Sequence, residues 1–254
     1  MRTLGPGYRE YVADEDFAAG YTDYQRRYAA EPRESDRVLI GHVAAALAPR
    51  PPGAGRARVL DVGCSTGNLM RHLARALPRA DLWGGELMPE ALAACRAAPD
   101  LDGMTFVEMD LLDIGHADVF DVIVVNAVLY LLGDDDLVRA LASVARALRP
   151  GGSLVAFDLF HPFEQHLTIR EASLTHPEGL VLHLRPHSLL RDAAARAGLG
   201  EPAIHAFAIP IDLPRPERDD EIVSYTVPAA SGERLLFRGA LAQPWCHVVA
   251  TRAG

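Results

Sequence analysis

The residues with the clearest chemical pattern lie in the segment VLDVGCSTG, residues 59–67. A short apolar strand there runs into a turn bounded by Gly63 and Gly67, and a helix is predicted to begin near Asn68. Backbone N–H groups and a helix N-terminus would then face a ligand at the carboxyl end of the strand, as in nucleotide sites. Asp61, inside the strand, would repel a pyrophosphate but attract the cationic amine of a nucleoside that carries an amino acid.

The glycine spacing argues against a nicotinamide cofactor. The dinucleotide fingerprint is G-x-G-x-x-G, whereas the two glycines here are separated by three residues and preceded by an acid. A nicotinamide oxidoreductase is therefore disfavoured.

Other polar residues follow further predicted strands. Glu86 closes one strand, and a single carboxylate can accept hydrogen bonds from both hydroxyls of a ribose. Asp110 and Asn126 follow two more. His161 comes soon after a fifth, where a neutral imidazole could take a proton from a nucleophile near pH 7 or could simply be bonded to a loop carbonyl. His166 and Glu164 lie near His161, but their spacing puts them on no common face, so no metal site is expected.

These residues need a parallel sheet to bring them together. From residue 58 onward, short Val/Ile/Leu-rich runs alternate with helical segments, which is typical of βαβ units in an α/β fold. The predicted strands are 58–62, 82–86, 105–108, 122–125, 154–158, 203–209 and 247–250, and the predicted helices are 69–76, 89–97, 134–148 and 187–197. A hairpin is expected over 222–227 and 234–237, and 160–185 is expected to be irregular.

With these motifs in this order, residues 58–159 resemble a class I S-adenosylmethionine (SAM) dependent methyltransferase. The resemblance implies a Rossmann-like, doubly wound seven-stranded sheet whose antiparallel last strand is 247–250. It implies SAM as cofactor, with Glu86 at the ribose, Asp110 at the adenine, and Asn126 with Ala127 beneath the methionine. Ser65 replaces a glycine that is usual in the family. The cofactor residues implied on this basis are Asp61, Gly63, Cys64, Ser65, Gly67, Glu86, Leu87, Asp110, Leu111, Asn126 and Ala127.

Residues 1–50 are expected to form an N-terminal helical cap on a methyltransferase domain over residues 51–254. Tyr21, Tyr24 and Tyr28 share one predicted helix face, which indicates either core packing or a cover for the cofactor. On the second interpretation Tyr21 contacts the cofactor, and Tyr28 joins His161 at the reaction centre. Ser35 is the expected N-cap of the next helix. Arg33 and Arg37 could hold a carboxylate, although solvated charges are the favoured interpretation.

The sequence favours methyl transfer to a small-molecule acceptor by in-line attack on the sulfonium methyl group. A second hypothesis comes from a faint resemblance of residues 24–28, 34–36 and 61–69 to enzymes that cyclise SAM to azetidine-2-carboxylate and release methylthioadenosine. A third is a SAM-binding protein without catalysis. The acceptor and the oligomeric state stay open.

Charge and composition exclude several other classes. With 25 Lys and Arg against 34 Asp and Glu, the net charge is −9, which disfavours nucleic acid as a partner. Three isolated cysteines indicate neither a disulfide framework nor a zinc site, and they suit a reducing cytoplasm. No stretch has the length and apolar character of a membrane span, so a soluble protein is expected.

Overall fold

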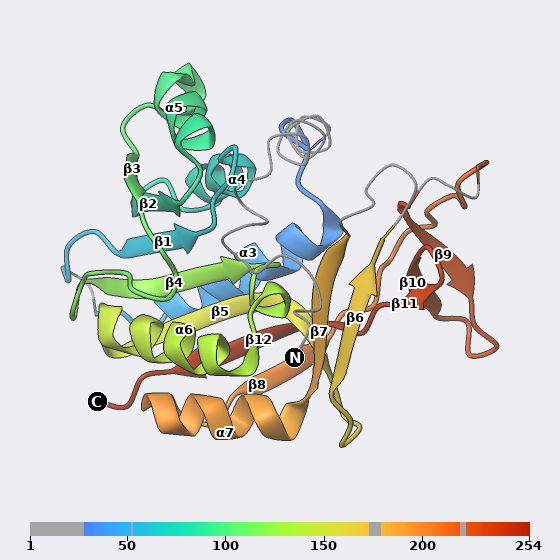
Figure 1. Ribbon diagram of the computed structural model, residues 1–254. Helices are drawn as coiled ribbons and strands as arrows, with labels where there is room; N and C mark the ends of the chain where they lie inside the picture. Colours follow the sequence, from blue (N-terminus) through green and yellow to red (C-terminus); the bar gives the residue numbers. More distant parts are fainter. Residues whose placement is uncertain (1–27, 52, 173–178, 219–221) are drawn as a thin grey trace.

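The computed structural model of the chain describes residues 28–51, 53–172, 179–218 and 222–254 (Figure 1). Its centre is a mixed sheet that runs through seven strands in the order β3-β2-β1-β4-β5-β12-β8. Their bounds are β1 Arg58–Val62, β2 Asp81–Glu86, β3 Thr105–Glu108, β4 Phe120–Asn126, β5 Leu148–His161, β8 Ala203–Ala206 and β12 Trp245–Thr251. The helices are α3 Glu34–Leu47, α4 Asn68–Ala76, α5 Pro89–Ala97, α6 Asp134–Ala147 and α7 His187–Ala197, with short 3-10 turns η1 Pro99–Leu101 and η2 Leu129–Leu131.

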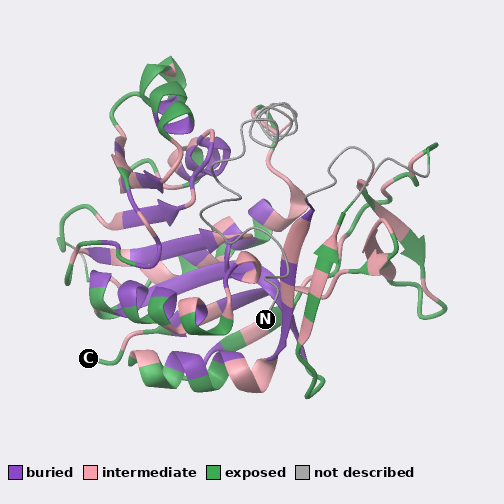
Figure 2. Cartoon of the chain, in the orientation of Figure 1, coloured by how far each residue is buried: buried purple, intermediate pink, exposed green. Residues whose placement is uncertain are grey.

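The central strands β1, β4 and β5 are buried on both faces, which is why they are largely apolar runs (Figure 2). Alternate residues of β5 show this directly. Leu154 and Ala156 join the core under α6 and α7, whereas Val155 and Phe157 join the core under α3 and α4. The helices therefore form one layer on each side of the sheet.

The strand order and directions confirm the expected α/β fold. The first five strands, β1 to β5, run parallel to one another. β12 pairs antiparallel with both β5 and β8. From β1 the strand order runs outward through β2 and β3, and the chain then returns to the other side of β1 to form β4 and β5. The strand order therefore reverses between β1 and β4, and their carboxyl ends form a topological switch point. Ligands of open α/β sheets bind at such points.

The expectation of an irregular segment over 160–185 is wrong. Two strands lie there, β6 Leu167–Glu171 and β7 Leu180–Pro186, and they pair antiparallel with each other. β7 also extends the end of β5, where His161 pairs with Pro186. β5 is longer than the predicted 154–158 at both ends, because its first residues pair with β4 and β12 and its last residues pair with β7.

The predicted hairpin is confirmed. β9 Ser224–Pro228 and β10 Arg234–Arg238 pair antiparallel, and β11 Leu241–Ala242 completes a small separate sheet at one end of the molecule (Figure 1). Tyr225 stacks on Phe237 across this hairpin, with ring centroids 5.7 Å apart.

Helix α3 begins two residues earlier than expected, because Ser35 is not its N-cap. Arg33 holds that position, and the Asp36 carboxylate accepts hydrogen bonds from the Arg33 backbone N–H at 3.3 Å and from its Nε at 2.8 Å. This capping arrangement fixes the start of α3 close to the carboxyl ends of β1 and β4. The carbonyl of Ser35 accepts instead a hydrogen bond from His247 Nε2 of β12, at 3.0 Å.

His247 gives this region a specific pH dependence. It is buried beside His42 and His205, and burial, opposed only in part by its bond to Ser35, lowers its pKa to about 4. The unfolded chain binds a proton at this group near pH 6.5 and the folded chain does not, so stability falls as pH drops from about 6.5 towards 4. Relative to His247→Gln, which keeps a donor for Ser35, wild type should lose about 1–2 kcal/mol of unfolding free energy over that interval.

Urea unfolding of both proteins at pH 7 and pH 4.5 measures this difference, and other titrating groups cancel in the comparison. His116→Gln is the matched control, because His116 packs on Trp83 outside the cluster. A constant difference between wild type and His247→Gln at the two pH values would contradict the prediction.

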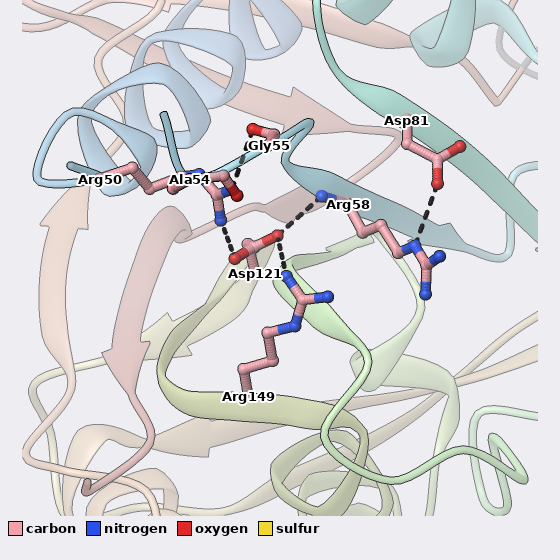
Figure 3. A network of polar contacts seen from close by, with 7 residues as sticks. All are labelled: Arg50, Ala54, Gly55, Arg58, Asp81, Asp121 and Arg149. Atoms are coloured by element: carbon pink, nitrogen blue, oxygen red, sulfur yellow. Dashed lines mark hydrogen bonds and ion pairs between the residues drawn. The ribbon is translucent and has the colours of Figure 1, made fainter. Parts of the chain in front are cut away.

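The opposite, amino-terminal edge of the sheet is held by Asp121 (Figure 3). Its carboxylate accepts a hydrogen bond from the backbone N–H of Arg58 at 2.7 Å and from the guanidinium of Arg149 at 2.9 Å, and it also pairs with Arg50. Arg50 in turn donates to the carbonyls of Ala54 and Gly55. One carboxylate thus ties the link between α3 and β1 to the start of β4.

Asp121→Ala should lower the free energy of unfolding by about 2 kcal/mol, because it leaves a half-buried N–H and two guanidinium groups without their acceptor. Urea denaturation measures the change. Asp136→Ala, which removes an exposed pair with Arg139, is the control and should cost about 0.5 kcal/mol or less. Equal losses in the two variants would refute the role given to Asp121.

Candidate cofactor and active site

The carboxyl edge of the sheet brings together the predicted loop and strand-end residues. β1 lies between β2 and β4, so the loop that follows Val62 is flanked by Glu86 and Asn126. Gly63 and Gly67 have φ angles of 79° and 76°, in the left-handed region that favours glycine. A Cβ on Gly67 would lie 2.6 Å from a methyl carbon of Leu101, so no larger residue fits without a shift of its neighbours.

The Glu86 side chain is already fixed by this loop. It is 7% exposed, and its Oε2 accepts a hydrogen bond from the backbone N–H of Ser65 at 2.8 Å. Its Oε1 accepts from the N–H groups of Leu87 and Met88 at 2.7 Å and 3.0 Å. Three N–H donors orient the carboxylate and fill both lone-pair positions of Oε1 and one of Oε2, so Oε2 retains a position for a further donor.

Ser65 shows how the departure from the usual glycine is accommodated. Its φ of 49° is in the left-handed region, so the loop keeps a glycine-like conformation with a serine in place. The Ser65 hydroxyl is buried and has no hydrogen-bond partner within the described part of the chain. A buried hydroxyl of this kind is suited to a polar ligand.

Cys64 lies beneath this loop, against the core. Burial and a hydrogen bond with Cys95 raise the pKa of the Cys64 thiol well above its usual range. Cys95 Sγ also contacts the carbonyl of Ser65 at 3.1 Å. The Cys64 side chain therefore supports the loop, and its backbone does so too, since its N–H donates to the carbonyl of Gly85 and its carbonyl accepts from the N–H of Gly67.

A cluster of three buried carboxylates occupies the switch point. Asp61 is 2% exposed, Asp36 is 1% exposed and Glu86 is the third. Burial, together with the negative charges of Asp36 and Glu86 and opposed by Arg33, raises the pKa of Asp61 to about 7. Asn126 Nδ2 donates to Asp36 Oδ1 at 3.1 Å, which links α3 to the end of β4.

Asp36 is the site residue that the sequence analysis missed. It lies on a predicted helix and follows no strand, so the strand-end pattern could not find it. Its only signal was a spacing of three from Arg33, which is the spacing of a reciprocal cap. Arg33, for which solvated charge was the favoured interpretation, has 23% of its side chain exposed and pairs with Asp36.

The residues expected around the adenine lie at the end of β3. The Asp110 carboxylate accepts a hydrogen bond from the N–H of Leu112 at 2.9 Å and is half-buried. The Leu111 side chain is fully buried in the core, so only its backbone could contact a ligand. Leu87 is half-buried beside Glu86.

Ala127 follows β4 with a φ of 60°, and its N–H donates to the carbonyl of Phe157 at 2.8 Å. This unusual backbone conformation turns the chain sharply after Asn126 and leads into η2. Asp158 and Arg185 hold η2 in place by hydrogen bonds to the backbone of Leu129. Asp158, whose pKa is raised to about 7 by burial, accepts the N–H of Leu129 at 2.7 Å, and Arg185 donates to the Leu129 carbonyl.

His161 and Tyr28 lie against different elements. His161 is 6% exposed at the end of β5, and both of its ring nitrogens are buried without a hydrogen-bond partner in the residues that the structure describes. Tyr28 lies beside α4, where its carbonyl accepts a hydrogen bond from His72 Nε2 at 3.0 Å, and the Arg33 guanidinium is 5.8 Å from its ring. Tyr21 and Tyr24 lie outside the described residues.

His166 and Glu164 form separate polar contacts. His166 Nδ1 lies 3.3 Å from Asp134, and Glu164 accepts a hydrogen bond from Ser188 at 2.6 Å. In residues 28–51, 53–172, 179–218 and 222–254, no group of three or more His, Cys, Asp or Glu side chains is arranged to hold a metal ion.

Comparison with known proteins agrees with this architecture. Residues 59–152 match the family model of a methyltransferase domain. The chain is 31% identical over 163 residues to the biotin biosynthesis bifunctional protein BioCD of Bordetella avium, covering 61% of this chain and 33% of that protein. It is 36% identical over 111 residues to the trans-aconitate 2-methyltransferase of Methylobacterium nodulans, covering 44% and 42%. The chain thus spans less than half the length of these two relatives.

Solved structures share the fold. The 1,6-didemethyltoxoflavin-N1-methyltransferase of Burkholderia thailandensis, solved with S-adenosylhomocysteine (SAH), gives a TM-score of 0.60 at 15% identity and covers 100% of this chain and 94% of its own. SAM-bound CalS10, an amino pentose methyltransferase of Micromonospora echinaspora, gives 0.58 at 20% identity and covers 91% and 96%. Among the described residues, no helix is long and apolar enough to cross a membrane.

Proposed function

Residues 59–152 form a domain of the class I SAM-dependent methyltransferase superfamily, and from this membership we propose that the chain transfers the methyl group of SAM to a small-molecule acceptor. Relatives named as methyltransferases of small molecules, such as trans-aconitate and 1,6-didemethyltoxoflavin, support this substrate class. The acidic net charge of −9 supports it too, because it disfavours a nucleic-acid acceptor.

The observation that carries the proposal is the charge of the switch-point site. Asp36, Asp61 and Glu86 are buried there, and among the described residues Arg33 is the cation beside them, paired with Asp36. Buried carboxylates in excess over cations favour a ligand that brings positive charge. SAM carries a sulfonium and an ammonium group, and its ribose supplies two hydroxyl donors for Glu86.

The remaining loop residues take roles that follow from their positions. The loop of Gly63, Cys64, Ser65 and Gly67 would surround the methionine portion by close approach of its backbone, whose N–H groups already donate within the chain. Asp110, with Leu87 and the Leu111 backbone, would bind the adenine. Asn126 and Ala127 would form the floor beneath the sulfonium. Residues 1–50 would act as an N-terminal cap on residues 51–254, since α3 already contributes Arg33 and Asp36 to the site.

The chemical step would then depend mainly on positioning. A nucleophile of the acceptor attacks the methyl carbon in line with the departing sulfur, and the products are the methylated acceptor, SAH and a proton. His161 would accept this proton, because neither of its buried ring nitrogens has a hydrogen-bond partner among the described residues. Exclusion of water and correct orientation supply the rest of the rate enhancement.

The test uses SAM with a deuterated methyl group and a fractionated metabolite extract as the source of acceptors. We expect mass spectrometry to find one acceptor that gains the labelled methyl group in step with SAH formation. Glu86→Ala, which impairs the cofactor site, should abolish both signals. Methylthioadenosine and azetidine-2-carboxylate formed from SAM alone would instead establish the cyclisation reaction. Tight SAM binding without any product from any fraction would establish a non-catalytic binding protein.

A further inference from the structure

A fully buried arginine lies beside the end of β5. Arg185 is 0% exposed and belongs to β7, which pairs with the carboxyl end of β5 (Figure 1). Phe160 is its partner in this pairing, and the next pair is His161 with Pro186. A charged group that has no contact with water is stable only when acceptors satisfy its donors, so the acceptors of Arg185 show which parts of the chain it holds.

All three nitrogens of the Arg185 guanidinium donate to the segment that follows β4. Nη1 donates to the carbonyl of Leu129 at 3.2 Å, and Nη2 donates to the carbonyl of Leu132, just beyond η2. Nε donates to the carboxylate of Asp134, the first residue of α6, at 2.8 Å. The donors of a guanidinium form a rigid planar fork, so these bonds fix η2 and the start of α6 relative to β7.

Strand β5 holds the same turn through a buried carboxylate. Asp158 is 0% exposed, and its Oδ2 accepts a hydrogen bond from the N–H of Leu129 at 2.7 Å. Its Oδ1 accepts from the N–H of Leu159 at 2.8 Å, which fixes the carboxylate on its own strand. Leu129 therefore has its N–H bound by β5 and its carbonyl bound by β7. These bonds join the turn after β4 to the pair of strands that carries His161.

The orientation of His161 depends on this backbone. Both of its ring nitrogens are buried and lack a hydrogen-bond partner among the described residues. In a catalytic triad, by contrast, a hydrogen-bonded carboxylate orients the imidazole. The position of the His161 ring relative to the end of β4 must therefore come from the strands that carry it and from what ties those strands to η2.

We propose that Arg185 is a positioning residue for methyl transfer, which sets the distance between the turn after β4 and His161 by holding Leu129. The inference rests on the proposed function, in which that turn lies beneath the sulfonium and His161 takes the proton of the acceptor. It adds a residue of β7, a strand that lies beyond the matched methyltransferase domain of residues 59–152.

Arg185→Lys tests the role, because it keeps the positive charge but cannot reproduce the fork of donors. We expect single-turnover methyl transfer to slow about 30-fold, since a misplacement of about 1 Å can cost about 100-fold. The affinity for SAH should stay within about twofold of wild type. The assay uses SAM with a deuterated methyl group and the extract fraction that contains the acceptor. Arg191→Lys, in an exposed pair with Glu201, is the control and should match wild type.

Combination with His161→Ala separates positioning from a merely structural role. If Arg185 acts through His161, Arg185→Lys should slow the His161→Ala protein by less than about twofold, because the group that it positions is gone. A slowing of about 30-fold in both backgrounds would overturn the inference. So would a wild-type rate in the Arg185→Lys protein.

Asp134→Asn is a second variant that leaves the buried groups in place, because the Asp134 side chain is 48% exposed. It weakens the bond to Arg185 Nε and should slow methyl transfer about threefold in wild type, but not in His161→Ala. Circular dichroism and SAH affinity establish whether Arg185→Lys is folded. If it is not, an unchanged rate in Asp134→Asn overturns the inference. Absence of methyl transfer by wild type would instead refute the proposed function itself.

Discussion

Replacement of His161 by alanine is expected to lower the turnover of methyl transfer by about 100-fold or more, while the affinity for SAH stays within about twofold of wild type. The expectation rests on the position of the ring at the end of β5, where both nitrogens are buried and have no partner among the described residues. A histidine that only supported a loop would have at least one nitrogen bonded to it. Single-turnover kinetics, with the acceptor that the deuterated-SAM experiment identifies, separates the chemical step from binding.

His166→Ala is the matched control, because His166 is a nearby histidine that is already paired with Asp134. It should retain turnover within a few-fold of wild type. Near-full activity of His161→Ala would show that positioning alone drives the reaction. A similar drop in both variants would point to a structural effect of the β5–β7 region instead.

Replacement of Glu86 by alanine is expected to weaken SAH binding by about 3 kcal/mol, which is more than 100-fold in affinity. The ribose hydroxyls lose a charged acceptor, and the N–H groups of Ser65, Leu87 and Met88 lose the carboxylate that orients the loop. Calorimetric titration with SAH measures the change, and circular dichroism at the same temperature establishes that the variant is folded.

Glu108→Ala provides the comparison for Glu86, because Glu108 occupies the matching register position on β3 and is exposed. Its SAH affinity should equal that of wild type. NADH should not bind either protein, since Asp61 and the glycine spacing disfavour a pyrophosphate. Unchanged SAH affinity in Glu86→Ala would remove Glu86 from the cofactor site.

Local patterns in the sequence predicted much of the fold. β1 and β3, and helices α5 and α7, have the predicted bounds, because strong β-branched or helical periodicity and flanking Gly or Pro residues define them locally. The strand-end rule brought Asp61, Glu86 and Asn126 to one edge, since parallel strands order their carboxyl ends together.

Other features depend on contacts between distant residues, which a single sequence does not display. β6 and β7 were missed because they pair with each other and β7 pairs with the end of β5, contacts between distant residues that Gly179 and Pro186 beside β7 do not specify. Asp36 was missed because an acid on a predicted helix is normally interpreted as exposed to solvent. Its burial becomes evident only from the contact between α3 and the end of β4. The sequence likewise does not show that the Ser65 hydroxyl and the His161 ring nitrogens are buried without a hydrogen-bond partner among the described residues, because this depends on the folded chain.

A crystal structure of the chain with SAH would locate each part of the cofactor against named residues of the switch point. We expect the ribose hydroxyls within hydrogen-bond distance of Glu86, the tail ammonium beside Asp61, and the sulfur facing the end of β5 that bears His161. SAH bound away from the carboxyl ends of β1, β2 and β4, or with its ribose out of reach of Glu86, would contradict it.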